Sequence, residues 1–505
     1  MDARLRALCD LTMTAAREGA GLHEYDGRIQ DLSPDGVRAG LAALGGGAEG
    51  VTREDPHDEA HLAAFEDHTR VAYGDLDMHR RNPVPHLENL ELAFYDKEYA
   101  PAAERAEARA RHLAQWPDAV AMALESLDRV SAPVAKATLG AARGQAAGIR
   151  PEDGESGTRA LAALERLVSH LEQAAEHGDP DPALGAAALA RLMGSGEALT
   201  VDLGRLAERA DAERDRLRGM LAEACKAYDP SRPPAELVPA LLADHPDADG
   251  ILAEARAQTA EVIEFSRAKK LAPYLDGVCE VGPAPESMRW AMAMMSWNAP
   301  GEAEAPSWYF VTPPDPSWPA EEIEEWLTIF SRTTLPAITV HEVAPGHFAH
   351  GRALRRAPTD VRRVLHSPSF AEGWAHYIEE VCLEEGFRAD DPRYAIGVCL
   401  EALLRVTRLA AAIGLHTGAM DVEEATRRFM ADAYVARAGA ASEARRGTFD
   451  PNYGCYTWGK LALRDLRENA RSTWGAGFTL ERFHTALLNL GSPPLGLIGT
   501  SVERG

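Results

Sequence analysis

The most informative stretch of this sequence is His341-Glu342-Val343-Ala344-Pro345-Gly346-His347. A His-Glu pair followed by a second His is the usual way for a helix to hold zinc beside a general base. In the standard motif the two histidines are four residues apart, whereas here they are six apart, roughly 240° around a regular helix. Pro345 cannot donate a hydrogen bond to the carbonyl of His341, and Gly346 tolerates backbone angles that other residues avoid. The sequence therefore predicts a distortion of the helix that returns His347 to the side of His341.

Two histidines do not complete a hydrolytic zinc site, which needs three protein ligands and an open position for water. We expect the third ligand to be a carboxylate or His on a neighbouring helix, and Glu372 is the best candidate. Ser369-Phe370-Ala371-Glu372 has the pattern of a capping box, which predicts the start of a helix. On that helix Glu372, His376 and Glu379 would share one face. Glu342 is adjacent to a ligand and can take the proton that the water must lose.

The choice of ligands stays open at this point, because five of the 17 histidines lie between positions 341 and 376. His350 follows His347 by three residues and could replace it as a ligand if the helix resumes there. His376 could bind the metal or lie behind a ligand. A site of two His and one carboxylate bound facially could also hold iron instead of zinc.

Two other groups of polar residues are interpreted as structural. His57-Asp58-Glu59-Ala60-His61 has two histidines at helical spacing, but no Glu directly follows the first, and its acidic residues are typical of a solvated helix. A second acidic group follows Pro319 at an expected helix start, where the helix dipole favours negative charge. Its members are Glu321, Glu322, Glu324 and Glu325.

The composition limits the classes of partner. The chain has 505 residues, 46% of them hydrophobic, which is enough to bury a sizeable core. Its formal net charge of −25 argues against nucleic acid and anionic lipid as partners, because both require clustered Lys and Arg. The N-terminus leads into no apolar segment and no apolar run reaches about 18 residues, so we expect neither a signal peptide nor a membrane span. Six scattered cysteines without a CxxC pair suit a reducing cytoplasm.

The periodicity of the first half predicts helices. Five apolar residues fall on one helical face, namely Leu161, Leu164, Leu167, Val168 and Leu171. The Ala-rich run 102–146 is similar, apart from an expected break at Pro117. Short turn-rich segments are expected to separate helices at 46–54, 148–157, 178–182 and 230–234.

Composition changes after about residue 270, where aromatic residues and prolines become more frequent. We therefore expect one mainly α enzyme. A helical N-terminal lobe would span residues 1–270, and a catalytic, metal-binding lobe would span residues 271–505. Trp308-Tyr309-Phe310-Val311-Thr312 predicts a short strand, which could pair with an extended substrate as exposed sheet edges do. Helices are expected from about Ala320, from about Pro336 with the His-Glu pair, and from Glu401 to about His416.

These blocks resemble the bacterial domain-of-unknown-function 885 family, whose members look like zinc metallohydrolases with HExxPGHxxQ and EGWAxYxE blocks. The second block is Glu372-Gly373-Trp374-Ala375-His376-Tyr377-Ile378-Glu379 here. The segment 408–416 is similar to the family's RLxxDxGLH block, and Tyr456-Thr457-Trp458-Gly459 to its YxxG block. The chain departs from the family at three positions, where His350 replaces Gln, Ala412 replaces Asp, and His376 replaces an aliphatic residue. The specificity is therefore expected to differ from that of relatives.

More distantly, the arrangement resembles helical gluzincin peptidases, in which a deep channel runs between helical lobes. That resemblance implies a mainly α, metallopeptidase-like fold, with two lobes around a channel and a small β element before the metal-binding helix. It also implies a role for each residue in the blocks. The implied metal ligands are His341, His347 and Glu372; the implied catalytic residues are Glu342 as general base and Tyr456 as oxyanion donor; the implied substrate-binding residues are Arg408, His416 and Tyr453.

Taken together, these features predict a cytoplasmic hydrolase with one Zn²⁺ per chain that acts on peptide or peptide-like amide bonds. Two other classes stay open. One is a metal enzyme of small-molecule metabolism that is not a peptidase, and the other is a metal-free binding protein on the same helical fold. The sequence leaves the substrate, the direction of cleavage and the oligomeric state undetermined.

Overall fold

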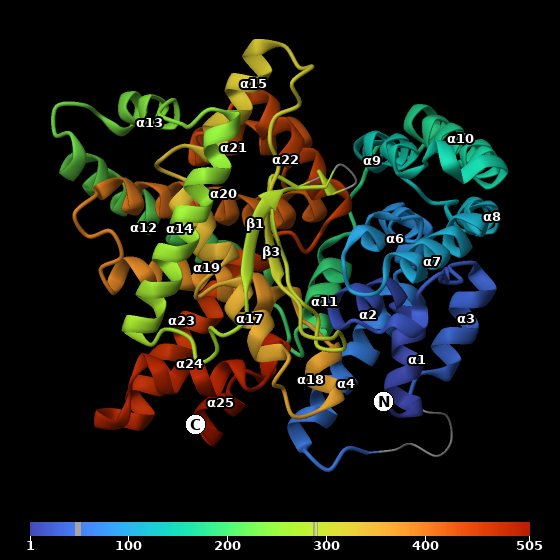
Figure 1. The fold of residues 1–505 in the computed structure, drawn as a ribbon, viewed down its shortest axis with the longest axis horizontal. Coiled ribbons are helices and arrows are strands. Elements are labelled where there is room, and N and C mark those ends of the chain that lie inside the picture. Colours follow the sequence, from blue (N-terminus) through green and yellow to red (C-terminus); the bar gives the residue numbers. More distant parts are fainter. Residues whose placement is uncertain (46–51, 286–287, 290) are drawn as a thin grey trace.

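The computed structural model describes residues 1–45, 52–285, 288–289 and 291–505, and it is mainly helical with one small sheet, as predicted. Part of the expected turn at 46–54 lies outside the described residues, because these begin again at position 52. The helices of the first part of the chain occupy the right-hand side of Figure 1, in blue to cyan. They are α1 (Ala3–Leu11), α2 (Met13–Ala20), α3 (Pro34–Ala43), α4 (Pro56–Thr69), α5 (Met78–Arg81), α6 (Val84–Glu88), α7 (Ala102–Ala114), α8 (Trp116–Ser126), α9 (Ala132–Gly144) and α10 (Gly154–His177).

Local sequence explains most boundaries of these helices. The expected break at Pro117 is present, because α7 ends at Ala114 and α8 begins at Trp116 with the proline in its first turn. Helix α10 buries Leu164, Leu167 and Leu171 in one hydrophobic core, whereas Leu161 is 39% exposed, so the predicted apolar face is one residue too wide.

Helix α4 differs from its prediction, because its polar residues are buried instead of solvated. His57, Asp58 and His61 are all less than 5% exposed. The Nε atom of Arg362, in α18 (Asp360–Val364), donates a 2.7 Å hydrogen bond to Oδ1 of Asp58. The two histidines therefore lie at a buried contact with the second half of the chain.

The next four helices come before residue 270 but lie with the C-terminal half, on the left and centre of Figure 1. They are α11 (Ala186–Gly196), α12 (Leu203–Tyr228), α13 (Pro234–Leu242) and α14 (Ala248–Lys269). Leu217 and Leu221 of α12 share a hydrophobic core with Leu403 and Val406 of α20 (Pro392–Thr417). Residue 270 therefore does not separate two cores, because three of the hydrophobic cores contain residues from both sides of it.

A three-stranded sheet follows, formed by β1 (Cys279–Pro283), β2 (Ala293–Ser296) and β3 (Ser307–Val311). Its order is β1-β3-β2, with β1 parallel and β2 antiparallel to β3. The predicted strand is therefore the central one, and the expectation that it offers an edge to a substrate is wrong. Tyr309 of β3 is fully buried and its hydroxyl lies 3.5 Å from Oγ1 of Thr339, which places the sheet against the helix that carries the His-Glu pair.

The remaining helices contain the predicted site. They are α15 (Ala320–Leu327), α16 (Leu335–Glu342), α17 (His347–Leu354), α18 (Asp360–Val364), α19 (Pro368–Glu384), α20 (Pro392–Thr417), α21 (Val422–Ala433), α22 (Arg437–Phe449), α23 (Cys455–Trp474), α24 (Leu480–Leu488) and α25 (Thr500–Arg504). The starts of α15 and α16 agree with prediction. Helix α20 starts at Pro392, nine residues before the expected start at Glu401, because its first turns bury apolar residues against the core.

The cap of α19 also differs from the prediction. Ser367, and not Ser369, is the N-cap, and its side chain accepts a hydrogen bond from the backbone N–H of Phe370. Pro368 occupies the first helical position, where its fixed φ and missing N–H are tolerated. Glu372 therefore lies beyond the first turn and is free of a capping role.

Helices α19 and α23 cross with almost no space between their backbones. A Cβ atom on Gly373 would lie 2.5 Å from the Cα of Gly459, and one on Gly459 would lie 1.9 Å from the carbonyl oxygen of Ser369. Only two glycines allow this approach. The crossing brings Glu372 of α19 close to Tyr456 of α23, so it determines the geometry of the predicted site.

We predict that Gly373→Ala lowers the melting temperature by about 3 °C. The added Cβ meets backbone atoms that cannot rotate away, which costs about 3 kcal/mol, the upper end of the usual range for overpacking. A 505-residue chain has an unfolding entropy of roughly 1 kcal/mol per degree, so each kcal/mol shifts the melting temperature by about 1 °C. Gly219→Ala in α12 is the control, since its Cβ would meet nothing within 4 Å and alanine favours the helix. Equal melting temperatures for Gly373→Ala and the parent would contradict the prediction.

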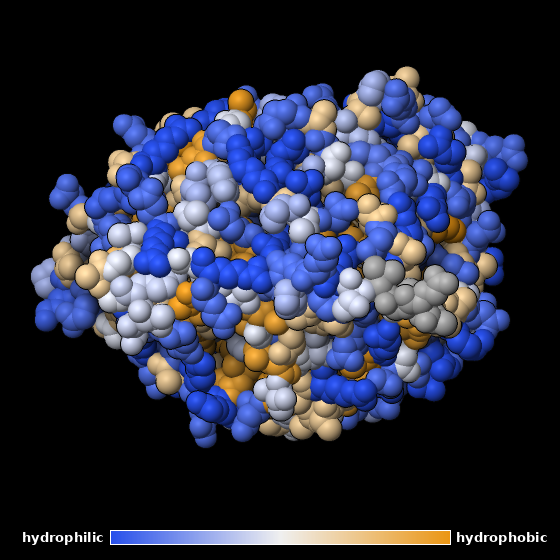
Figure 2. Space-filling view, turned by 90° about the horizontal axis from the view of Figure 1, so that it is seen from below, coloured by the Kyte–Doolittle hydropathy of each residue, from blue (hydrophilic) through white to orange (hydrophobic). Residues whose placement is uncertain are grey.

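The surface is mainly polar, as the excess of 78 Asp and Glu over 53 Lys and Arg leads one to expect. Figure 2 shows one face with hydrophilic residues over most of it and small hydrophobic areas between them. Among the described residues, no helix combines the length and the apolar character needed to span a membrane.

Candidate metal centre

The helix that carries the His-Glu pair is broken where the sequence predicts a distortion. Helix α16 ends at Glu342 and α17 begins at His347, with a cis peptide bond between Ala344 and Pro345. The break brings the imidazole rings of His341 and His347 to a centroid separation of 4.7 Å, with their planes perpendicular.

Close packing holds the break in place. A Cβ atom on Gly346 would lie 1.9 Å from the carbonyl oxygen of His341 and 2.5 Å from that of Val340, so only glycine fits there. On the other side, Nε1 of Trp374 in α19 donates a 2.9 Å hydrogen bond to the carbonyl oxygen of Pro345. The break is thus fixed to the helix that carries Glu372.

The three predicted ligands come together in the structure. Oε2 of Glu372 lies 3.4 Å from Nε2 of His341 and 3.4 Å from Nε2 of His347. One donor atom from each residue lies within 4.8 Å of the others, and no second cluster of this kind occurs among the described residues. Two ligands at about 2.05 Å from one ion in tetrahedral geometry are separated by roughly 3.3 Å. The donor types and spacing therefore fit a zinc ion.

The electrostatics of these residues favour an added positive charge. Burial alone raises the pKa of Glu372, but the two neighbouring imidazoles lower it well below its usual value. Burial and the positive charge of Arg405 lower the pKa of His341, while hydrogen bonds to Glu372 and Glu379 raise it, to a net value of about 9. A site that stabilises positive charge in this way is suited to a cation.

Glu342 follows His341 directly at the end of α16. Its side chain is buried, and its Oε2 atom has no hydrogen-bond partner among the described residues. A buried carboxylate oxygen without a hydrogen-bond partner destabilises the fold, which favours a functional role for Glu342. Glu342 is thus a buried acidic residue next to a predicted ligand, which is consistent with its predicted role as general base.

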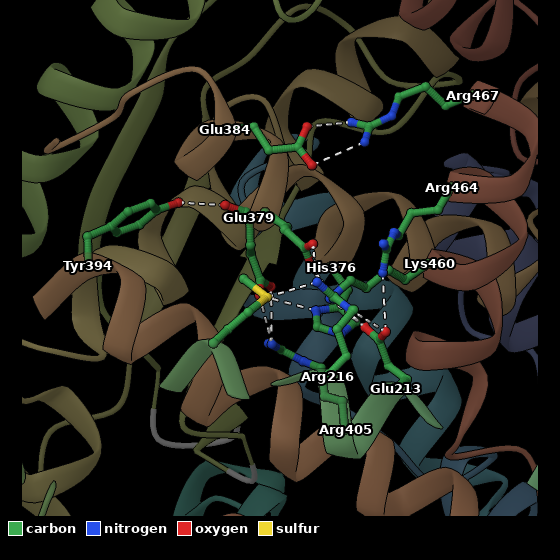
Figure 3. A network of polar contacts seen from close by, with 12 residues as sticks. Glu213, Arg216, His376, Glu379, Glu384, Tyr394, Arg405, Lys460, Arg464 and Arg467 are labelled. Carbon is green, nitrogen blue, oxygen red and sulfur yellow. Dashed lines mark hydrogen bonds and ion pairs between the residues drawn. The ribbon is translucent and has the colours of Figure 1, made fainter. Parts of the chain in front are cut away.

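The residue that the sequence did not assign is Glu379, which is fully buried. Its Oε1 lies 2.6 Å from Nδ1 of His341, and its Oε2 lies 3.2 Å from Nδ1 of His376. Arg405 of α20 forms an ion pair with the same carboxylate at 3.1 Å. Figure 3 shows His376, Glu379 and Arg405 within a larger network of polar contacts. The only signal in the sequence was the shared helix face of Glu372, His376 and Glu379.

The two alternative histidines lie behind the cluster. Nε2 of His350 points to the carbonyl oxygen of Gly491 at 3.3 Å, and its ring packs on Phe370. Burial lowers the pKa of His350 and of His376 to about 3, so both rings are neutral. His376 contacts the carboxylate of Glu379 and belongs to the support of His341.

Tyr456 lies at the cluster, with its ring 6.2 Å from that of His341 and nearly parallel to it. Burial and the nearby Glu372 carboxylate raise the pKa of the phenol, so the hydroxyl keeps its proton and can donate it in a hydrogen bond. The guanidinium groups of Arg405 and Arg408 lie 5.7 and 5.5 Å from the centre of the Tyr456 ring. Such contacts between cations and aromatic rings hold the ring in place.

The three predicted substrate-binding residues do not all lie at the cluster. Arg408 is close to the cluster, but Nε and Nη2 donate hydrogen bonds of 2.8 and 2.7 Å to Glu443. Tyr453 is buried, and its hydroxyl has no hydrogen-bond partner among the described residues. His416 lies eight residues after Arg408 on α20, roughly 12 Å along the helix axis, so it is remote from the cluster.

Two solved structures share this fold over nearly the whole chain. One is a protein of unknown function from Shewanella oneidensis, described as a proposed lipoprotein, with a TM-score of 0.77, 22% identity and coverage of 99% of this chain and 98% of that chain. The other, from Colwellia psychrerythraea and also described as a proposed lipoprotein, has a TM-score of 0.79, 17% identity and coverage of 99% and 96%. No curated protein shows a significant match to the chain. The family model described as "Bacterial protein of unknown function (DUF885)" matches residues 14–502, and the chain belongs to this family.

Proposed function

We propose that this protein is a zinc-dependent hydrolase of peptide or peptide-like amide bonds. The observation that supports this most directly is the 3.4 Å spacing of Glu372 Oε2 from both His341 Nε2 and His347 Nε2, beside the unpartnered carboxylate oxygen of Glu342. Three protein donors and an adjacent carboxylate are the minimum that metal-assisted hydrolysis requires. One bound Zn²⁺ would polarise the substrate carbonyl and lower the pKa of water.

Each residue then has a separate task. His341, His347 and Glu372 would hold the ion. Glu342 would accept the proton of the attacking water and pass it to the leaving amine. Tyr456 would donate its hydroxyl proton to the oxygen on which negative charge develops, an interaction worth a few kcal/mol in the transition state.

The sheet supports an extended peptide as the substrate, through β2 instead of the predicted β3. The backbone N–H of Thr312 donates to the carbonyl of Met292, so alternate residues of β2 face β3, and the N–H and C=O groups of Ala293 and Met295 face outwards. No other described strand pairs with that edge. Trp297 follows β2 directly, and its ring lies 6.3 Å from that of His347. A peptide added to this edge would run towards the metal centre.

One alternative has support in the donor set. Two His and one carboxylate also suit iron, so a non-peptidase metal enzyme of small-molecule metabolism is the second candidate. A metal-free binding protein is the third class. We also propose a cytoplasmic location, which is supported by six cysteines that are all free of disulfides.

Metal analysis distinguishes these classes. We expect purified protein to contain one zinc per chain, to hydrolyse members of a peptide library, and to lose at least 100-fold of that rate when a chelator removes the metal. Re-addition of zinc should restore the rate. Iron at one per chain would support the second candidate, and protein that takes up neither metal would refute both enzyme proposals.

A further inference from the structure

The contacts of Glu379 go beyond those of an ordinary buried ion pair. Its side chain is fully buried, and both carboxylate oxygens are occupied. Oε1 accepts from Nδ1 of His341 at 2.6 Å, and Oε2 accepts from Nδ1 of His376 at 3.2 Å. Nη1 of Arg405 lies 3.1 Å from each of these oxygens. Three donors from three helices thus converge on one carboxylate.

The contact with His341 determines which nitrogen of that ring is free. In the neutral ring that metal binding requires, a hydrogen bond from Nδ1 to Glu379 places the one remaining proton on Nδ1 and leaves the lone pair on Nε2. Nε2 is the atom that faces Glu372 at 3.4 Å. A carboxylate behind a ligating His fixes both the tautomer and the ring orientation, and its loss typically weakens metal binding 10- to 100-fold.

The other two contacts hold this carboxylate in place. Arg405 supplies the positive charge that a buried carboxylate requires, and its guanidinium also lies against the Tyr456 ring at 5.7 Å. His376 donates to the oxygen that does not face His341, so the carboxylate cannot rotate away from the ring. An aliphatic side chain at position 376 would leave that oxygen with Arg405 alone.

From this geometry we infer that Glu379 is the positioning residue of the metal centre, and that His376 and Arg405 fix its carboxylate against His341. The inference rests on the proposed function, because it requires that His341 binds zinc. It adds a role for His376, which is not one of the three clustered donors. The same Arg405 joins the support of a ligand to that of Tyr456.

Glu379→Gln tests the inference, with Glu380→Gln as the matched control. Glu380 is the next residue of α19, about 100° further around the helix, is also buried, and forms ion pairs with Lys460 and Arg216 and none with His341. We expect the zinc Kd, measured by competition with a chromophoric chelator, to rise 10- to 100-fold in Glu379→Gln and to stay within threefold of the parent in Glu380→Gln. The visible spectrum of the Co²⁺-loaded protein should change only in Glu379→Gln.

Variants at position 376 keep the test decisive if Glu379→Gln does not fold. His376→Leu removes the donor to Glu379, and we expect the zinc Kd to rise about tenfold. His376→Asn places an amide N–H near the position of Nδ1 and should restore most of the affinity. Parental Kd values in both Glu379→Gln and His376→Leu would overturn the inference, as would equal weakening in Glu380→Gln. A parent chain that binds no zinc would instead refute the proposed function.

Discussion

Glu342→Gln is expected to retain one zinc per chain and to cleave peptides about 10³-fold more slowly than the parent. Glutamine has the same shape but cannot take up a proton, so only the general-base step is removed. A positioned base contributes between about 10² and 10⁴ to the rate. The side chain is not one of the three clustered donors, so the amide should leave zinc affinity unchanged. Initial rates on a peptide library, with zinc content measured on the same samples, check both parts.

Glu321→Gln is the control for this experiment, because Glu321 is an exposed residue at the start of α15, remote from the cluster. It should cleave at the parental rate. A Glu342→Gln protein that holds zinc and cleaves as fast as the parent would show that another group accepts the proton. A variant that loses zinc would show that Glu342 belongs to the ligand set.

The part of the site that the sequence could predict depends on local covalent properties. Pro345 has no N–H to donate, and Gly346 has no Cβ to restrict its backbone. Both properties hold whatever surrounds the two residues. A helix that cannot continue through these two positions must redirect His347, and the structure ends α16 at Glu342 and starts α17 at His347. The sequence predicted the distortion for this reason.

The supporting residues could not be predicted because they depend on contacts between distant helices. Glu379 was known only to share a helix face with Glu372. Whether that face meets His341 depends on the crossing of α19 with α16, and the pairing with Arg405 depends on the position of α20. The same limit explains the error in the sheet. A run of aromatic and β-branched residues identifies a strand such as β3, but strand order follows from pairings that the local sequence does not specify.

Gly346→Ala is expected to remove zinc binding from the folded protein. The new Cβ would lie 1.9 Å from the carbonyl oxygen of His341 and 2.5 Å from that of Val340, and both are backbone atoms of α16. Relief of this clash requires the start of α17 to move away from α16, which carries His347 out of reach of His341 and Glu372. A misplacement of about 1 Å is enough to disable a site of this kind. Zinc content and zinc affinity are the measurements that check this.

Gly140→Ala is the matched control, since a Cβ there would meet nothing within 4 Å, and we expect it to bind one zinc per chain. Overpacking against backbone costs about 3 kcal/mol, which in a chain of 505 residues shifts the melting temperature by only about 3 °C. Zinc affinity is therefore the more sensitive measurement, because a displaced ligand weakens it by orders of magnitude. If Gly346→Ala bound zinc with the parental Kd, the break at Pro345 and Gly346 would not be what brings His347 to the metal.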